Sequence, residues 1–305
     1  MARVLVACPF GEKPLEMLRG AGLEVDYRPK IAQSEFDEIY AEYDGVVVRG
    51  NVKVRPTKGK GNLKLVVRAG SGVDNIAVDE FIELGVNVFN TPDAVAESVG
   101  ELAAGLMINL SRGIIRAATA LSQGEWMKHG LMGQELSGKT LGIIGLGRIG
   151  SVVARIAHAI GMRVLVYDVE KFSPEYLARF GAEQVGLERL LSESDYVSIH
   201  TPLTEETKLM IGERELRMMK KTAFLINTAR GQVVDEEALK VALKEGWIAG
   251  AALDVFKEEP PRDLELLKLP NLIATPHIGA QTREAQDKAA AEAAHILIRE
   301  LRRSP

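Results

Sequence analysis

The stretch from Thr140 to Asp168 constrains the fold more than any other part of the chain. Its apolar run, Leu141–Ile144, suits a strand that is buried on both faces, and the motif GLGRIG follows directly. The first glycine of such a motif allows a tight turn, and the second lets the backbone approach a pyrophosphate. The third lets the following helix pack close to the strand. The pattern predicts a strand, a glycine-rich turn and a helix from Ile149 to roughly Ile160.

A spaced acid completes this pattern. A second apolar strand, Arg163–Tyr167, ends at Asp168, which lies about 20 residues beyond the glycines, where an acid can bind the hydroxyls of a ribose. The helix N-terminus offers N–H groups and partial positive charge to a diphosphate. The motif alone can also be a simple tight turn, and Asp168 a solvated acid, but together they predict a Rossmann domain that binds NAD. The predicted cofactor contacts of the motif are Gly145, Gly147 and Gly150.

Composition is that of an ordinary globular protein. The chain has 305 residues, enough for two domains, and is 46% hydrophobic and 26% charged. A net charge of −4 gives no reason to expect nucleic acid or an anionic membrane as partner. The only cysteine, Cys8, allows no internal disulfide and favours a reducing compartment. With no signal-peptide pattern and no apolar run of about 18 residues, we expect a cytoplasmic protein without membrane spans.

Alternating strands and helices predict two doubly wound α/β domains. The first has strands at 4–7, 23–27, 45–49, 63–67 and 86–89, with helices at 14–19, 36–42 and 79–84. The second has seven strands, at 141–144, 163–167, 182–185, 196–199, 223–226, 249–253 and 272–274. Its helices lie at 174–179, 187–191, 213–219 and 236–244. A final helix, 282–302, is long enough to cross back over the first domain. We therefore expect a flavodoxin-like substrate domain at 1–94 and 283–305, and the Rossmann domain at 95–282.

Two further segments indicate a partner surface. After a turn at 90–93, a single helix is predicted from Val95 to Leu121. It is apolar nearly all round, as expected of a helix buried in a core or against a second subunit. The segment from Ser122 to Ser137 contains Trp126 and other apolar residues without clear periodicity, which is typical of an exposed arm that contacts a partner.

Three side chains suited to hydride-transfer chemistry follow late strands of the second domain. Arg230, Glu259 and His277 come after successive strands, and parallel strands end at one edge of a sheet. A guanidinium binds a carboxylate, an imidazole exchanges a proton with a hydroxyl, and a carboxylate orients that imidazole and raises its pKa. Each also has a plain interpretation, as a helix cap for Arg230 and His277 and as a solvated acid for Glu259. No Cys, His and carboxylate cluster has the spacing of a metal site, so no metal is expected.

These motifs resemble the D-isomer-specific 2-hydroxyacid dehydrogenase family over nearly the whole chain, and within it the D-3-phosphoglycerate dehydrogenase branch. The matching segments are VVVRG (46–50), VVRAGSGVDNI (66–76), FNTPDAVAESVGELA (89–103), GKTLGIIGLGRIG (138–150), INTARG (226–231), ALDVF with EEPP (252–261) and TPHIGAQT (275–282). The resemblance implies Arg230, Glu259 and His277 as the catalytic set. It further implies a homodimer, or a dimer of dimers, that forms through the long helix and the arm.

The resemblance also implies binding residues. The cofactor contacts that it implies are Ser71, Arg148, Ile149, Asp168, Thr201, Thr228, Asp254 and Gly279, to which we add the strand-end His200 and the neighbouring Pro202, Ala229 and Ala280. Backbone amides of Ser71 and Gly72 would hold the substrate carboxylate, with Arg230 and His277 at the reacting end. For a phosphate, the sequence offers Arg49 with Lys53 and Arg55, and Lys128 from a second subunit. These cations can equally be solvated surface groups.

The implied reaction is the NAD-dependent oxidation of D-3-phosphoglycerate to 3-phosphohydroxypyruvate, the first step of serine biosynthesis. A hydroxypyruvate or glyoxylate reductase of the same family and an NAD-sensing corepressor on the same fold stay open as alternatives. Ala77 stands where the family often has Asp, a departure that touches no inferred role. The chain reaches Pro305 directly after its last predicted helix, so we expect no serine-sensing regulatory domain and no serine inhibition.

Overall fold

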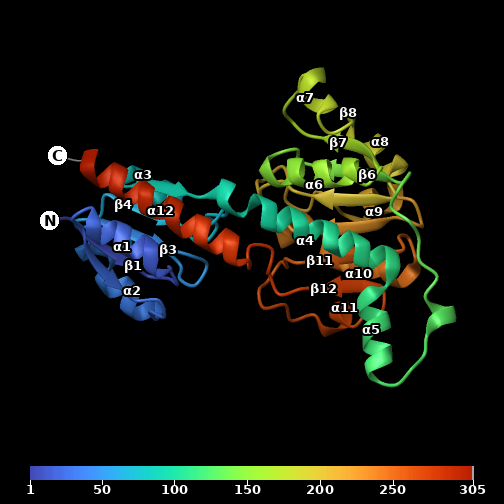
Figure 1. Ribbon diagram of the computed structural model, residues 1–305, viewed down its shortest axis with the longest axis horizontal. Coiled ribbons are helices and arrows are strands. Elements are labelled where there is room, and N and C mark those ends of the chain that lie inside the picture. The colour runs from blue at the N-terminus through green and yellow to red at the C-terminus, as the bar shows by residue number, and fades with distance from the viewer. Residues whose placement is uncertain (304–305) are drawn as a thin grey trace. The chain divides into compact units, whose positions relative to one another are not determined.

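Two compact units make up the molecule. The computed structural model describes residues 1–303, and its ribbon is drawn in Figure 1. One unit combines Met1–Ser98 with the chain from Ala280 onward, and the other is Val99–Gly279. We call these unit 1 and unit 2. The boundaries expected from the sequence are 94/95 and 282/283. Within residues 1–303, no helix is long and apolar enough to cross a membrane.

Unit 1 is built on a five-stranded parallel sheet in the flavodoxin-like order β2-β1-β3-β4-β5. Its strands are β1 (Arg3–Val6), β2 (Glu24–Tyr27), β3 (Gly45–Val48), β4 (Leu65–Arg68) and β5 (Asn87–Asn90). Its helices are α1 (Glu12–Gly20), α2 (Gln33–Ile39), the 3-10 turn η1 (Tyr40–Glu42), α3 (Val78–Glu83) and α12 (Arg283–Arg303). The central strand β3, with the sequence GVVV, is buried throughout, as expected of a strand with helices on both faces.

The last helix of the chain completes the core of unit 1. Helix α12 packs against α1, β3 and β4, and Figure 1 draws it alongside these elements. Its inner face consists of small or aliphatic residues, among them the buried Ala293, Ala294 and Leu297. A Cβ built on Gly45 would lie 2.9 Å from Leu297 Cδ2, so the absence of a side chain at Gly45 lets α12 approach the sheet.

Unit 2 is built on a seven-stranded parallel sheet in the order β12-β11-β10-β9-β6-β7-β8, the Rossmann order extended by one strand. Its strands are β6 (Thr140–Ile144), β7 (Arg163–Tyr167), β8 (Ala182–Gln184), β9 (Tyr196–Ile199), β10 (Phe224–Asn227), β11 (Gly250–Leu253) and β12 (Leu272–Ala274). Its helices include α6 (Arg148–Ala159), α7 (Pro174–Ala178), α8 (Leu187–Glu193), α9 (Glu213–Met218), α10 (Glu236–Glu245) and α11 (Leu264–Leu267). The seven strands and the two α/β folds predicted from the sequence are confirmed.

The single helix predicted from Val95 to Leu121 is wrong. The chain instead forms α4 (Pro92–Arg112) and α5 (Ile114–Ser122), separated by Gly113. Gly113 has a φ of +59°, in the left-handed region that ends helices, and the side chain of Asn109 accepts a hydrogen bond from the N–H of Ile115 at 3.0 Å. The predicted turn at 90–93 is also shorter than expected, because α4 begins at Pro92. Proline is well suited to the first position of a helix, where a backbone N–H would have no partner within the helix.

Candidate active site

The glycine-rich turn between β6 and α6 has the geometry that its sequence predicts. Gly145 has a φ of +95°, which strongly favours glycine. A Cβ on Gly150 would overlap the carbonyl oxygen of Gly145, so α6 packs directly on the end of β6. By contrast, a Cβ on Gly147 would meet no heavy atom within 4 Å. The backbone at Gly147 therefore faces open space, as the approach of a pyrophosphate requires.

Asp168 is fixed beside this turn. One carboxylate oxygen accepts the N–H of Leu146 at 2.8 Å, and the other accepts the N–H of Glu170 at 3.0 Å. Leu146 lies between the first two glycines of the motif, so the bond ties the end of β7 to the glycine-rich turn. Each carboxylate oxygen has a second lone pair, so the side chain can still accept further hydrogen bonds.

Three polar atoms at the carboxyl ends of β9 and β10 are buried without a hydrogen-bond partner. They are Nδ1 of His200 and the hydroxyl oxygens of Thr201 and Thr228. The other ring nitrogen of His200 lies 2.8 Å from the hydroxyl of Ser198, and burial lowers the pKa of His200 to about 3, so the ring is neutral. Buried polar groups without partners are costly, about 1–3 kcal/mol each. Pro202 is exposed and Ala229 is buried beside these atoms in the chain.

A buried carboxylate shapes the segment that follows β12. Asp254, 1% exposed, accepts the hydroxyl of Thr275 at 2.6 Å, the N–H of Ile278 at 2.9 Å and the N–H of Gly279 at 2.8 Å. These donors lie on both sides of His277 in the chain. From the sequence, Asp254 is predicted only as a cofactor contact. Its structural role is not predictable there, because its hydrogen-bond partners lie 21–25 residues away in the chain.

His277 and Glu259 form a hydrogen-bonded pair. Nδ1 of His277 donates to Oε2 of Glu259 at 2.8 Å, and Oε1 of Glu259 accepts the N–H of Phe256 at 3.1 Å. His277 has a φ of +52°, an uncommon conformation for a residue with a Cβ. The turn that Asp254 holds maintains this conformation, and the pairing leaves Nε2 of His277 for a substrate.

The pair shifts the pKa of both partners. The hydrogen bond to Glu259 raises the pKa of His277 above its ordinary value, against the effect of burial, and the charges of Glu259 and Asp254 act in the same direction. Burial alone would raise the pKa of Glu259, but the hydrogen bond and charge of His277, the Phe256 N–H and the charge of Arg230 together lower it. The carboxylate is therefore charged at neutral pH, and the imidazole holds its proton more strongly than a free histidine.

Arg230 lies at the end of the neighbouring strand, and its charge acts on both members of the pair. Its backbone carbonyl accepts the side-chain amide of Asn227 at 2.9 Å, and its guanidinium donates to the carbonyl of Ala229 at 2.6 Å. Strands β10, β11 and β12 are adjacent in the sheet. Unit 2 therefore brings the three predicted catalytic residues together at the carboxyl edge of these strands.

A pair of arginines marks the corresponding edge of the sheet in unit 1. Arg49 follows β3 and Arg68 ends β4, and Val48 is the register partner of Arg68. Arg49 donates to the carbonyl of Gln286 in α12 at 3.3 Å, and Arg68 donates to the carbonyl of Ala69 at 2.8 Å. Both charges act on the buried Cys8, although burial dominates there and raises the pKa of the thiol to about 12.

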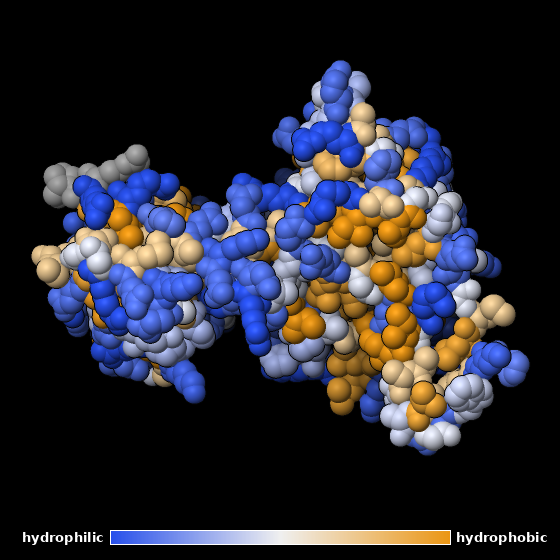
Figure 2. Space-filling view, in the orientation of Figure 1, coloured by the Kyte–Doolittle hydropathy of each residue, from blue (hydrophilic) through white to orange (hydrophobic). Residues whose placement is uncertain are grey.

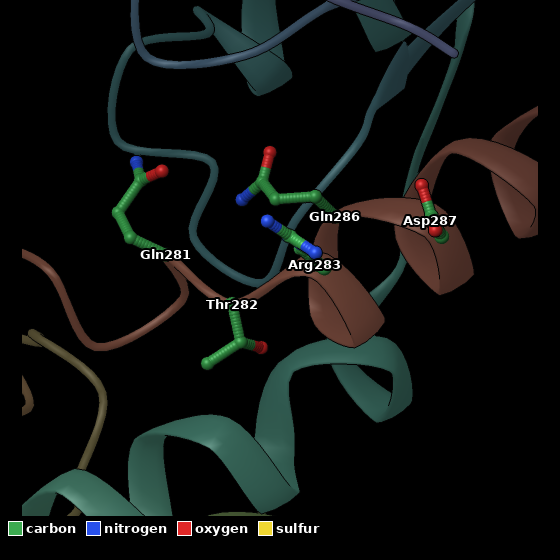
Figure 3. A pocket seen from close by; sticks show the side chains of 5 residues that line it. All are labelled: Gln281, Thr282, Arg283, Gln286 and Asp287. Carbon is green, nitrogen blue, oxygen red and sulfur yellow. The ribbon is translucent and has the colours of Figure 1, made fainter. Parts of the chain in front are cut away.

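The start of α12 borders a shallow hollow of about 450 Å³ in unit 1. Figure 3 shows its lining side chains, of which Gln281, Arg283 and Gln286 project to one side of the turn and Thr282 to the other. The side-chain amide of Gln286 donates to the carbonyl of Ala280 at 2.8 Å. Ser71 and Gly72, the predicted carboxylate-binding residues, also belong to unit 1, where the carbonyl of Ser71 accepts the side-chain amide of Asn90.

The two cations that the sequence grouped with Arg49 have contacts of their own with α3 and α2. The guanidinium of Arg55 pairs with Glu80 of α3 at 3.7 Å. Lys53 is exposed, and its backbone exchanges two hydrogen bonds with the side chain of Gln33 in α2. Lys128 is exposed in the 3-10 turn η2 (Lys128–Gly130) of unit 2. Arg68 ends β4, and Arg49 directly follows the adjacent strand β3, so the two arginines lie at the same edge of the sheet.

Residues 104–279 match the model of the D-isomer specific 2-hydroxyacid dehydrogenase, NAD binding domain. The chain belongs to this family. It is 46% identical to a hydroxypyruvate reductase of Thermotoga maritima over 98% of both chains. It is also 43% identical to a D-3-phosphoglycerate dehydrogenase of Methanocaldococcus jannaschii over 99% of this chain, which spans 58% of that relative's length. The crystal structure of D-lactate dehydrogenase from Aquifex aeolicus complexed with NAD and lactic acid superposes with a TM-score of 0.85, at 30% identity, covering 98% of this chain and 95% of that one.

Family membership makes unit 2 an NAD-binding domain, and the geometry fits that cofactor. The open backbone at Gly147 and the first turn of α6 suit the diphosphate, and Asp168 beside them suits a ribose. The buried, unpartnered hydroxyls of Thr201 and Thr228 are groups that a polar ligand can satisfy. The individual contacts remain predictions.

Replacing Glu259 with Gln tests the origin of the raised His277 pKa. The neutral amide keeps the size of the side chain but removes the charge that stabilises imidazolium, so the pKa of His277 should fall. The titration of His277 in the free protein, followed by NMR and assigned with His277→Asn, measures this. The pair also makes the stability of the fold depend on pH. The pair stabilises the fold below the ordinary histidine pKa, and this stabilisation disappears as the pH rises through the raised value, a dependence that Glu259→Gln should reduce. An unchanged His277 titration would contradict the pairing.

Asp168 should make the protein prefer NAD to NADP. The carboxylate accepts hydrogen bonds from ribose hydroxyls and repels a 2′-phosphate, so kcat/KM should favour NAD by about tenfold or more. Asp168→Asn should reduce the ratio of kcat/KM for NAD to kcat/KM for NADP. Glu170→Gln, a change at an exposed neighbour, should leave this ratio nearly unchanged. Equal kcat/KM values for the two cofactors with the unaltered protein would show that Asp168 does not select between them.

Proposed function

We propose that this protein is an NAD-dependent D-2-hydroxyacid dehydrogenase that oxidises D-3-phosphoglycerate to 3-phosphohydroxypyruvate, the reaction that opens serine biosynthesis. Unit 1 is then the substrate domain and unit 2 the cofactor domain. The observation that carries the choice of substrate is the pair of neighbouring arginines, Arg49 and Arg68, in unit 1, in addition to Arg230 in unit 2.

The catalytic roles follow from the contacts in unit 2. NAD, when bound, supplies the hydride acceptor for oxidation of the hydroxyl carbon. Nε2 of His277 takes the hydroxyl proton, because Nδ1 is engaged by Glu259. The resulting imidazolium is stabilised by the Glu259 carboxylate, and in the reverse direction it returns the proton. Arg230 binds the substrate carboxylate and holds the reacting carbon in place.

The arginine pair suits a second anionic group on the substrate. A simple 2-hydroxy acid has one carboxylate, for which Arg230 suffices. A phosphate carries close to two negative charges and three acceptor oxygens, so it can engage two guanidinium groups at once. Arg68 ends β4 and Arg49 directly follows the adjacent strand β3, and both side chains are half-buried, which limits screening by solvent.

A hydroxypyruvate reductase is the second candidate, because the relative with that name matches over 98% of both chains. Hydroxypyruvate has a hydroxyl where the phosphorylated acid has its phosphate, so the two candidates differ in what Arg49 and Arg68 contact. The third candidate function is a sensor that binds NAD without catalysis. Such a protein would bind NADH, but the NADH absorbance would not change with any of the acids tested.

The substrate prediction is tested by NADH absorbance with a panel of D-2-hydroxy acids, their keto acids and their phosphorylated forms. D-3-Phosphoglycerate should give the highest kcat/KM. Arg49→Ala should raise KM for that substrate by about 10-fold or more, since a charge-assisted contact is worth about 1.5–3 kcal/mol. It should change KM for glycerate little. Arg55→Ala, whose guanidinium pairs with Glu80, is the matched control and should behave as the parent.

Other results identify the alternatives. Equal losses with both substrates upon Arg49→Ala would assign Arg49 to the carboxylate. No response to Arg49→Ala or Arg68→Ala, with turnover of hydroxypyruvate or glyoxylate, would replace the proposal by the reductase.

We also propose that the protein is a homodimer that forms through α4, α5 and the segment after them. Exposed apolar side chains gather there, as Figure 2 shows over α4 and α5. They are Ile108, Ile114, Ile115, Leu121, Trp126 and Met132. A contiguous apolar surface on a single chain typically marks a protein interface. A second copy of the chain is the partner that we propose.

A charge in this surface should separate the dimer. Ile115 is 54% exposed on α5, and Ile115→Glu should lower the sedimentation coefficient from that of a dimer to that of a monomer, because a carboxylate in an apolar interface loses its water. Ile82→Glu, at a residue 60% exposed on α3 of unit 1, is the control and should sediment as the parent. A monomeric parent protein at micromolar concentration would overturn the proposal.

A further inference from the structure

The peptide groups around Lys257 connect the segment of Arg230 to that of Glu259. The N–H of Lys257 donates to the carboxylate of Glu236, and the carbonyl of Lys257 accepts the side-chain amide of Gln232 at 3.1 Å. Both partners follow Arg230 in the chain. The preceding N–H, of Phe256, donates to Glu259 itself. The loop after β11 is therefore bonded on one side to the Arg230 segment and on the other to the acid that pairs with His277.

Close packing of the two backbones strengthens this connection. A Cβ on Gly231 would overlap the backbone of Phe256 and Lys257, so the residue next to Arg230 lies directly against the loop. Residues 254–259 lie outside the helices and strands. The start of this loop is held by the N–H of Asp254 on the carbonyl of Asn227 and by the buried Phe256, and the side-chain hydrogen bonds to Lys257 add to this support.

Glu236 occupies a position that is costly for a carboxylate. It is half-buried in the first turn of α10, and burial raises its pKa, as do the charges of Asp263 and Glu237. The hydrogen bond and charge of Lys257 oppose that shift. Lys240, the other cation here, is bonded to Asp263 at 2.7 Å and to Glu237 at 2.8 Å. The neighbouring Glu237, by contrast, is 77% exposed.

We propose that Glu236 and Gln232 are positioning residues for the reaction. By holding the peptide groups on either side of Lys257, they fix the Glu259 carboxylate at Nδ1 of His277 and keep Arg230 in place relative to that pair. Neither residue touches the substrate, and their effect on His277 passes through Glu259. This inference rests on the proposed function, because it takes the catalytic roles of Arg230, Glu259 and His277 from there. It does not depend on which 2-hydroxy acid is the substrate.

The test compares Glu236→Ala and Glu236→Gln with the control Glu237→Ala. In Glu236→Ala the midpoint of the His277 NMR titration in the free protein should fall by about half a pH unit or more, because Glu259 loses its fixed position. kcat should fall by about 10-fold or more, with the Kd for NAD within about twofold of the parent. Glu236→Gln retains an acceptor oxygen and should recover most of both losses. Glu237→Ala should match the parent.

A double variant identifies the path of the effect. Once Glu259→Gln is present, adding Glu236→Ala should move the His277 titration no further, since the group through which Glu236 acts is gone. A His277 titration that is the same in Glu236→Ala and the parent overturns the proposal, whatever substrate the protein uses. If Glu236→Ala does not fold, Gln232→Leu decides in its place. It should shift the His277 midpoint in the same direction, and an unchanged midpoint refutes the positioning role.

Discussion

The buried carboxylate of Asp254 is the interaction on which the candidate active site most depends. It takes three hydrogen bonds from residues on either side of His277, and charge-assisted bonds of this kind are about twice as strong as neutral ones. These bonds hold His277 in a left-handed conformation that few residues other than glycine adopt. Without this support, relaxation of the turn would move the imidazole away from Glu259.

The site is assembled from irregular chain that begins where regular structure ends. Strands β10, β11 and β12 bring three segments to one edge, but Arg230, Glu259 and His277 all lie beyond the last paired residue of their strands. Their placement therefore relies on side-chain contacts with the backbone, such as those of Asn227 with Arg230 and of Glu236 with Lys257. The sheet supplies the approximate position and these contacts supply the orientation.

Much of this molecule could be predicted from sequence because its strongest signals are local. The glycine motif, the apolar strands and the spacing to Asp168 each depend on residues that are near one another in the chain, and the fold that they predict is the one observed. What was missed involves distant partners or a single backbone angle. The apolar pattern predicts one helix where the left-handed Gly113 separates two. Arg55, which the sequence groups with Arg49, instead pairs with Glu80. The hydrogen bonds that Asp254 accepts from residues 275–279, and those of Lys257 with Gln232 and Glu236, likewise cannot be predicted from the local sequence, since the partners lie some 20 residues apart in the chain.

The return of α12 to unit 1 governs the order in which the chain can become a folded molecule. Residues 1–98 are made before unit 2, yet helix α12, which packs against β3 and β4 and includes the buried Leu297, is made about 200 residues later. At the usual rate of synthesis that delay is roughly 10–40 s. Unit 2 is continuous in sequence and can complete its core in the meantime. Unit 1, whose larger segment is made before unit 2, is therefore completed after unit 2, and until then its apolar strands are open to chaperones and to other nascent chains.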